Sequence, residues 1–391
     1  MALEIKLEHE DRSADNYLRT VSFRVGSSTS GRVLPVWDNE VPIPPRLPSW
    51  WSPISEMYAA LTLGELRHID GDAIAQERFI KRHFTPISGT VGLPILKLLV
   101  APDDRLRETD YDYLSALIPP PNSLIAVTPL LYGYHITSRG VVRPDFSVDQ
   151  PRYLEFVRNF VTQVTSGGAK ELAIAVPPTV SFTGIGKLLE IYKDISTPFA
   201  VIDANGGTNR ERYPQLKALV GIGQKDSFNL TEKHGDSFAL HGFDCKPFRG
   251  RAEVVAAINA LQLDNGLSSF GRRRTNRVMI KRKKGVPPPA PKPPMVFYPK
   301  EIGYARATVP GVIEELRRWH KGIVAEPLVD SELLKRRRAF EIERLAGVAY
   351  QLSEWSSAGE LDKQLAKRKV IQGDLKAIKR NNGIIFTPPL G

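Results

Sequence analysis

Four short apolar segments constrain the fold of this chain more than any other feature of its sequence. They are rich in Val, Ile and Leu, and they occupy residues 94–102, 124–129, 172–177 and 199–203. Their apolar character is continuous rather than alternating, which is typical of parallel strands covered on both faces. Helical patterns lie between them, so strand and helix alternate along the chain. The sequence therefore predicts an α/β domain built from βα repeats.

The way these segments end favours a (β/α) barrel over a doubly wound open sheet. Each segment ends in proline or aspartate, as at the mouth of a barrel, where the loops after the strands build the site. No GxGxxG or GxxxxGK[ST] motif stands in a strand-to-helix turn, which argues against a nucleotide-binding open sheet. We therefore predict a barrel-like domain over residues 85–270 and expect no cofactor.

Before this domain, the sequence predicts a strand-containing N-terminal portion over residues 1–84. Apolar and charged side chains alternate over residues 3–8 and, more loosely, over residues 18–25, which indicates two strands of a half-exposed sheet. Residues 54–67 and 72–82 are predicted to form short helices.

Basic residues are concentrated in the last third of the chain. Residues 271–391 contain 26 lysines and arginines against 12 acidic residues, whereas residues 1–270 contain 28 against 31. The densest stretch is a basic, proline-rich linker, residues 271–300, with ten basic residues and no acidic one. Nucleic-acid phosphates supply the counter-charge that such a density calls for. The alternative is a solvated, disordered linker whose charges only keep the chain in solution.

Residues 301–391 predict a basic helical domain after this linker. Two long helices joined by a short turn are typical of an antiparallel hairpin, and its outer faces carry further basic clusters. We expect nucleic acid, either DNA or RNA, as the partner of the basic residues. Pairing of the helices with another protein, or contact of the tail with an acidic protein, is the alternative. The residues expected to contact phosphate are Arg249, Arg251, Arg272, Arg273, Arg274, Arg277, Lys281, Arg282, Lys283, Lys284, Arg336, Arg337, Lys367 and Arg368.

Two aspartates are the candidate catalytic residues. Asp203 ends a predicted buried strand and is followed by Gly206 and Gly207, which let a backbone approach a ligand closely. Asp244 is a candidate nucleophile or base. Alternatively, Asp203 only caps the following helix. A second alternative is a metal site, but its candidate ligands match no standard spacing, so we predict no metal. Those ligands are His234, His241, Asp244 and Cys245.

The segment around Asp244 resembles tRNA-guanine transglycosylases. Gly221-Ile222-Gly223 is followed some twenty residues later by Phe243-Asp244-Cys245, a proline and arginines, much as a glycine pair on one barrel strand precedes a Phe-Asp-Cys strand end in that family. The resemblance implies that Asp244 attacks the ribose carbon as the base leaves. It covers about 30 of the 391 residues. The zinc cysteines of the family have no counterpart here. The Asp-Ser-Gly-Gly-Phe motif of the family is matched only by a distorted sequence at a different position, Asp-Ala-Asn-Gly-Gly over residues 203–207.

The cysteine content and the hydropathy of the chain indicate its cellular compartment. Cys245 is the single cysteine, so no disulfide can form within the chain. The first residues are charged and lack the apolar stretch of a secretory signal. The most apolar run, residues 91–101, is shorter than the roughly twenty residues that a membrane span needs. We therefore expect a soluble, cytoplasmic protein. Contact of the tail with a membrane surface is a further alternative, but the tail lacks the amphipathic aromatic face that membrane docking usually needs, so we expect no membrane partner.

These features together predict a nucleic-acid-binding protein whose barrel-like domain modifies or exchanges a base in DNA or RNA. In the alternative, the protein is not an enzyme. It then binds nucleic acid or assembles with a partner, and the barrel is a scaffold.

Overall fold

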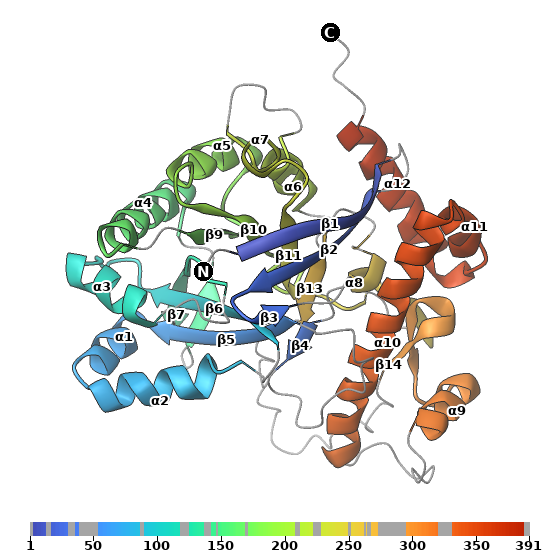
Figure 1. Ribbon diagram of the computed structural model, residues 1–391. Coiled ribbons are helices and arrows are strands. Elements are labelled where there is room, and N and C mark those ends of the chain that lie inside the picture. Colours follow the sequence, from blue (N-terminus) through green and yellow to red (C-terminus); the bar gives the residue numbers. More distant parts are fainter. Residues whose placement is uncertain are drawn as a thin grey trace.

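The computed structural model of the 391-residue chain is a mixed α/β structure with a helical region at the carboxyl end (Figure 1). It describes residues 3–12, 17–29, 36–38, 54–86, 90–117, 125–136, 142–145, 148–168, 171–207, 212–221, 228–248, 252–261, 263, 267–272, 295–319 and 331–386. The basic linker predicted for residues 271–300 lies mostly outside these ranges.

Two sheets of mainly parallel strands form the centre of the molecule. The first has the order β4-β5-β6-β7-β8 and is parallel except for β8, and the second has the all-parallel order β9-β10-β11-β13. The strands are β4 (Val36–Asp38), β5 (Ile54–Thr62), β6 (Val91–Val100), β7 (Leu130–Ile136), β8 (Val142–Asp145), β9 (Leu172–Val176), β10 (Ser196–Asp203), β11 (Ala239–Cys245) and β13 (Ser269–Arg272). The predicted parallel strands β6, β9 and β10 are confirmed.

The two sheets meet on both sides. A parallel bridge between Val127 and Ala173 joins them on one side, and β13 lies beside β4 on the other. The hydrogen-bonded pairs of the described residues nevertheless form two sheets. The α/β class is therefore established, and closure into one barrel stays a prediction.

Helices cover the outer faces of these strands (Figure 1). They are α1 (Leu63–Asp70), α2 (Ala73–His83), α3 (Glu108–Leu117), α4 (Gln150–Ser166), α5 (Phe182–Ile191), α6 (Tyr213–Leu219) and α7 (Leu230–His234). Asp149 caps α4 as predicted, because its side chain accepts from the backbone N–H of Arg152 at 2.9 Å. Outward-facing side chains of β6, β9 and β10 pack with these helices in one large core.

The prediction of a helix over residues 54–67 is wrong in its first half. Residues Ile54–Thr62 form strand β5, which pairs with both β4 and β6. The helix α1 begins only at Leu63, because Thr62 and Glu65 form a capping box that fixes its start. Burial between two neighbouring strands outweighs the helical preference of this segment.

A hairpin closes the amino end of the interior. It comprises β1 (Leu3–Arg12), β2 (Tyr17–Val25) and the short β3 (Ser28–Thr29), and the first two are the strands predicted for the N-terminal portion. Leu3 and Val21 join the inner core. The buried guanidinium of Arg19 donates to the carbonyl oxygens of Asp236 and Phe238, just before β11. The hairpin therefore lies at the ends where the parallel strands begin.

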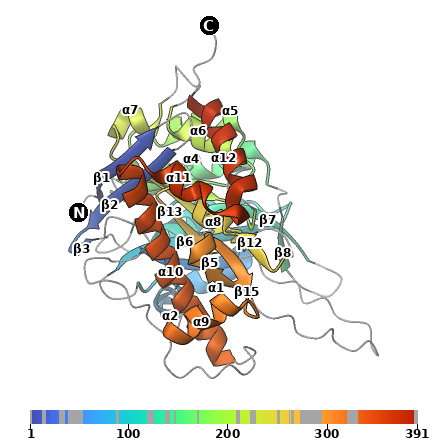
Figure 2. The same ribbon diagram turned by 90° about the vertical axis from the view of Figure 1, so that its right-hand side faces the viewer.

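The last part of the chain packs on the side of the molecule as a C-terminal layer. This layer comprises the antiparallel sheet β12 (Val254–Ala256), β15 (Gly303–Arg306) and β14 (Met295–Tyr298), the 3-10 turns η3 (Pro299–Glu301) and η4 (Lys369–Ile371), and the helices α8 (Ile258–Leu261), α9 (Pro310–Trp319), α10 (Ser331–Ser357), α11 (Leu361–Ala366) and α12 (Gln372–Phe386). Figure 2 shows this layer facing the viewer, with α10 running along it. The second helix of the predicted hairpin is divided between α11, η4 and α12.

This layer shares one core with elements that precede the basic linker. Leu352 of α10 and Ile371 of η4 are buried together with Val255 of β12, Leu261 of α8 and Leu18 of β2. Ser356 of α10 also donates to Asp11 of β1 at 3.1 Å. The C-terminal helices are therefore packed against the body rather than standing apart from it.

Candidate functional site

Two polar clusters lie on the inner face of the parallel strands. Inner positions alternate along each strand, and most of them are apolar, such as Ile95 and Val201. The polar side chains at inner positions form two groups. The strand-end cluster contains Lys97, Tyr132, Asp203 and Asp244, and the mid-strand cluster contains Glu56, His241 and Ser269.

Lys97 connects the members of the strand-end cluster. Its Nζ lies 2.7 Å from Oδ2 of Asp203 and 3.7 Å from Oδ2 of Asp244. Tyr132 donates its hydroxyl hydrogen to the same oxygen of Asp203 at 2.7 Å. Lys97, Asp203 and Asp244 are 4%, 0% and 1% exposed, so water screens these charges little. Side chains from β6, β7, β10 and β11 thus meet at one point.

The backbone around the two aspartates is unusual. Asp244 has a φ of 53° and Asn205 a φ of 45°, a left-handed conformation that costs free energy for any residue other than glycine. Hydrogen bonds hold it in place: the N–H of Gly206 donates to the carbonyl of Asp244 at 2.7 Å, and that of Lys246 to the carbonyl of Gly207 at 2.8 Å. Such outliers gather at functional sites, where the surrounding structure enforces them.

The charges of the cluster set the protonation of its members. Burial alone would lower the pKa of Lys97, but the neighbouring Asp203, Tyr58 and Asp244 outweigh it, and the pKa is raised above its ordinary value. The pKa of Tyr132 is raised well above its ordinary value, first by burial and then by the charge of Asp203. At neutral pH, Lys97 is therefore a cation and Tyr132 a neutral donor.

This arrangement suits nucleophilic or acid–base chemistry. Two carboxylates lie at the carboxyl ends of neighbouring strands, β10 and β11, where parallel α/β folds place their sites. A fixed cation lies next to both of them, 2.7 Å from Asp203 and 3.7 Å from Asp244, and a carboxylate in such a position can attack or accept a proton.

The mid-strand cluster is built differently. His241 contacts Oγ of Ser269 through Nδ1 at 2.8 Å and Oε2 of Glu56 through Nε2 at 2.9 Å. All three residues are fully buried and lie on regular strand backbone. Gly271 leaves the room that Glu56 needs, since a Cβ at this position would lie 1.6 Å from Oε2 of Glu56. This cluster crosses the interior and ties β5 to β11 and β13.

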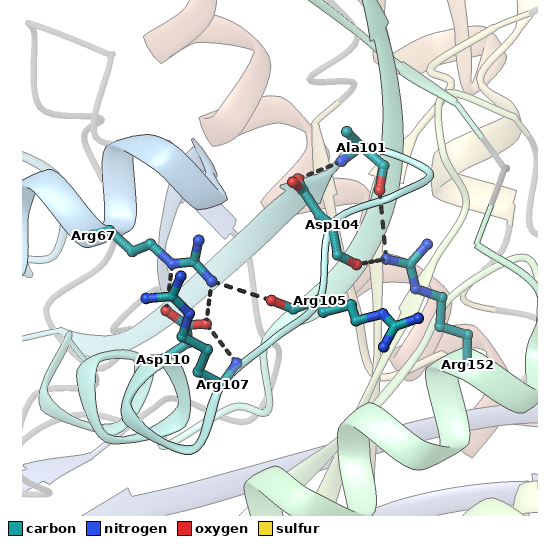
Figure 3. A network of polar contacts seen from close by, with 7 residues as sticks. All are labelled: Arg67, Ala101, Asp104, Arg105, Arg107, Asp110 and Arg152. Carbon is teal, nitrogen blue, oxygen red and sulfur yellow. Dashed lines mark hydrogen bonds and ion pairs between the residues drawn. The ribbon is translucent and has the colours of Figure 1, made fainter.

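The loop after β6 is fixed by two arginines, as Figure 3 shows. Arg67 donates twice to the carboxylate of Asp110 at 2.8 Å and once to the carbonyl of Arg105 at 3.1 Å. Arg152 donates to the carbonyl of Asp104 at 2.6 Å. Burial would raise the pKa of Asp110, but its hydrogen bonds with Arg67 and with a backbone N–H lower it overall. The loop places exposed Arg105 at the carboxyl edge of the strands.

Both predicted catalytic aspartates are in the strand-end cluster. The alternative that Asp203 caps the next helix is wrong, because the N-cap of α6 is Arg212, and Oδ1 of Asp203 accepts from the N–H of Asn205 at 2.6 Å. Gly221, which the resemblance would place on a strand, lies in the turn after α6.

The candidate metal ligands are not brought together. His234 ends α7, before β11 begins, and burial together with the charge of Lys233 lowers its pKa to about 4. The thiol of Cys245 points to the carbonyl of Phe243, 3.8 Å away. Within the described ranges, no group of three or more His, Cys, Asp or Glu side chains is arranged to hold a metal ion.

Most of the basic residues predicted to contact phosphate lie outside the described residues. Arg249, Arg251 and residues 273–284 are not in the described ranges, nor are the side chains of Arg272, Arg336 and Arg337. Lys367 is exposed and donates to Oε1 of Gln364 at 3.1 Å. Arg368 instead lies over the ring of Trp355, 4.5 Å from its centre, and burial lowers its pKa.

The sequence-based choice of site residues omitted Lys97, Tyr132 and Glu56. Lys97 carried a usable signal, because a lysine inside an apolar segment that is buried on both faces must find an acidic partner. Glu56 was hidden by the assignment of its strand to a helix. Tyr132 carried no signal in the sequence.

A scan against protein-family models finds no match for this chain, and a search of the curated proteins finds none either. No helix within the described ranges has both the length and the apolar character that crossing a membrane requires. The case for a function therefore depends on the geometry of the strand-end cluster and on the chemistry of its residues.

Proposed function

We propose that this chain is an enzyme that modifies or exchanges a base in a nucleic acid by glycosyl transfer, with Asp244 as the nucleophile. The observation that supports it most is the pair of aspartates at the ends of β10 and β11, which share one buried lysine. The left-handed backbone of Asp244 adds to this, because strain of that kind is usually retained for function.

The geometry favours Asp244 over Asp203 as the attacking group. Asp203 accepts hydrogen bonds from Tyr132 and from the N–H of Asn205 and lies 2.7 Å from the ammonium group of Lys97. These contacts lower its reactivity and fix its position. Asp244 lies 3.7 Å from the same ammonium group, beyond hydrogen-bond distance. Asp203 then orients Lys97 and balances its charge.

In the proposed reaction, a carboxylate oxygen of Asp244 bonds to C1′ of the nucleotide. The bond from C1′ to the base breaks, and its electron pair leaves with the base nitrogen, which takes up a proton. An incoming base then loses a proton, bonds to C1′ and displaces the carboxylate of Asp244. Covalent catalysis of this kind divides one difficult substitution into two easier ones.

The basic residues support a polynucleotide as the substrate. The exposed Arg105 stands at the edge where a nucleotide would approach Asp244, and the exposed Lys367 and Lys369 extend the positive charge of the C-terminal layer. The basic linker adds ten more positive charges. Contacts of these groups with phosphate release counterions and strengthen binding at low salt.

The test is incorporation of radiolabelled guanine into total tRNA and into duplex DNA, with the wild-type chain and the Asp244→Asn variant. We expect incorporation by the wild type and only background incorporation by the variant. The matched control is Ser269→Ala, which alters the mid-strand cluster and should keep the rate within a few-fold. A denaturing gel should show a nucleic-acid adduct of the wild type that Asp244→Asn lacks. Wild-type protein that gives neither incorporation nor adduct contradicts the proposal.

Nucleic-acid binding is tested on the full chain by replacing the eight basic residues of the segment 272–284 with Gln. Truncation before Gly271 is unsuitable, because it would expose the core that α10 shares with β12 and α8. The slope of log affinity against log salt for duplex DNA should flatten by roughly 0.9 for each phosphate that the variant no longer neutralises. A control variant, Lys379→Gln, removes a lysine that already pairs with Asp362 at 2.7 Å, so it should leave the slope nearly unchanged.

A second candidate is a non-catalytic nucleic-acid-binding or assembly protein. The near-complete burial of Lys97, Asp203 and Asp244 favours it, because buried ion pairs also serve only to connect strands. In that case, Asp244→Asn changes the free energy of unfolding but leaves nucleic-acid affinity unaltered, and no adduct forms with any variant.

A further inference from the structure

We infer that Lys97 is the general acid and base of the reaction, and that it gives its proton to the leaving base and recovers it from the incoming one. This inference rests on the proposed function and deepens it. Glycosyl exchange requires a proton donor within reach of the leaving base. Nζ of Lys97 lies 3.7 Å from Oδ2 of Asp244 and is therefore close to the carbon that Asp244 would attack.

The neighbouring groups within the described structure are poorer donors. Asp203 accepts hydrogen bonds from Tyr132 and from the N–H of Asn205 and faces the ammonium group of Lys97, so its oxygens act as acceptors in all of these contacts. Tyr132 directs its hydroxyl hydrogen at Asp203, and burial there strongly disfavours the tyrosinate. The thiol of Cys245 is directed at the carbonyl of Phe243. Of Asp203, Tyr132, Cys245 and Lys97, Lys97 is the group that holds a transferable proton near Asp244.

The net charge of the strand-end cluster also supports Lys97 as the general acid and base. Before the reaction, one cation and two carboxylates give a net charge of −1. Once Asp244 is bonded to C1′ its charge is gone, and a Lys97 that kept its proton would leave the net charge of the cluster at 0 while the departing base carried a charge of −1. Transfer of that proton to the base restores −1, and the base leaves as a neutral molecule. A site as dry as this favours a path on which its total charge stays constant.

The charges around Lys97 also determine when it releases its proton. Asp203 and Asp244 both favour the protonated form of Lys97 before Asp244 attacks. When Asp244 forms its bond to C1′, one of these carboxylates becomes a neutral ester and the ammonium group becomes more acidic. The proton is therefore released as the C1′–N bond breaks. The reverse sequence returns it when the incoming base attacks and the carboxylate of Asp244 re-forms.

The experiment compares two leaving bases in whichever nucleic acid the wild type acts on. Guanine needs a proton to leave as a neutral molecule, whereas 7-methylguanine, produced by treatment with dimethyl sulfate, already carries the positive charge and needs none. Lys97→Met should slow guanine release by about 10²–10⁴-fold, the usual contribution of general acid–base catalysis. Release of 7-methylguanine, corrected for the reaction without protein, should fall by less than about ten-fold.

Two further variants control for folding and charge. Lys97→Arg keeps a positive charge but cannot give up its proton near neutral pH, so it should show the same selective loss. In Lys97→Gly, added alkylamines should restore guanine release, with rates that depend on the pKa of the amine. An equal loss for both bases in a folded variant, or no loss at all, overturns the role of Lys97. Absence of release by the wild type overturns the proposed function itself, and with it this inference.

Discussion

The strand-end cluster and the mid-strand cluster lie on the same inner face of the strands, yet they are built in opposite ways. In the strand-end cluster, a lysine faces two carboxylates where strands give way to loops, and Asp244 has a strained backbone. In the mid-strand cluster, His241 lies between Glu56 and Ser269 on regular strands, with hydrogen bonds on both ring nitrogens.

The difference distinguishes two roles that buried polar side chains can have, one in catalysis and one in connecting strands. In both clusters the contacts cross between strands, but the mid-strand cluster matches one acidic side chain, Glu56, with one basic side chain, His241, as suits a structural connection. The strand-end cluster holds one more acid than base and keeps costly backbone geometry, neither of which stability alone would favour. Substitutions that test this contrast should affect chemistry in one cluster and stability in the other.

The largest effect on stability should come from Lys97→Met. Removal of the cation takes away the positive charge that the buried Asp203 and Asp244 share, and breaking a buried pair in this way costs about 3–5 kcal/mol. Urea unfolding measures the loss. The double variant Lys97→Met with Asp203→Asn should recover part of it. If Lys97→Met is as stable as the wild type, the ion pair contributes nothing and the contrast between the clusters fails.

Lys97→Met also tests how the free energy of unfolding changes with pH. The pKa of Lys97 is raised in the folded chain from an ordinary value of 10.5. Its contribution to stability is therefore fully present below about pH 10 and is lost as the pH rises through the folded-state pKa. The stability difference between wild type and Lys97→Met should shrink above pH 10.5 and stay constant between about pH 7 and 9. A difference that shrinks near neutral pH instead contradicts the raised pKa.

Gly271→Ala should have the next largest effect, and it tests the mid-strand cluster. The added methyl group would meet Oε2 of Glu56, which can move only by breaking its contact with His241. Crowding of this kind costs about 1–3 kcal/mol. Thermal unfolding should show a lowered Tm, whereas guanine exchange per folded molecule should be unchanged. A variant that unfolds like the wild type but has lost exchange would give the mid-strand cluster a catalytic role.

The smallest effects should come from removing single hydroxyl groups, one in each cluster. Ser269→Ala removes a hydrogen bond to His241 and should cost about 1 kcal/mol with no change in exchange rate. Tyr132→Phe removes a donor to the charged Asp203 and should cost about 2 kcal/mol. It should also slow exchange, because the position of Asp203 and Lys97 is disturbed. Equal effects of the two variants on the exchange rate would remove the distinction between the clusters.

Individual elements show which parts of the fold were predictable. Strands β6, β9 and β10 and the start of α4 at Asp149 followed from local patterns, because apolar runs and caps depend on neighbouring residues. The local pattern of β5 predicts a helix instead, because burial between two strands is not a local property. The packing of α10 against β1 and β2 was not predictable either, since its contacts join the two ends of the chain.

The amino-acid sequence alone determined the class of the fold, the charge asymmetry and the two aspartates at strand ends, because each of these depends on residue type and short-range order. Only the tertiary structure decided that Asp203 and Asp244 share Lys97 and that Glu56 meets His241, 185 positions away in the chain. Such meetings depend on strand order and register, which the free energy of the whole packed interior selects.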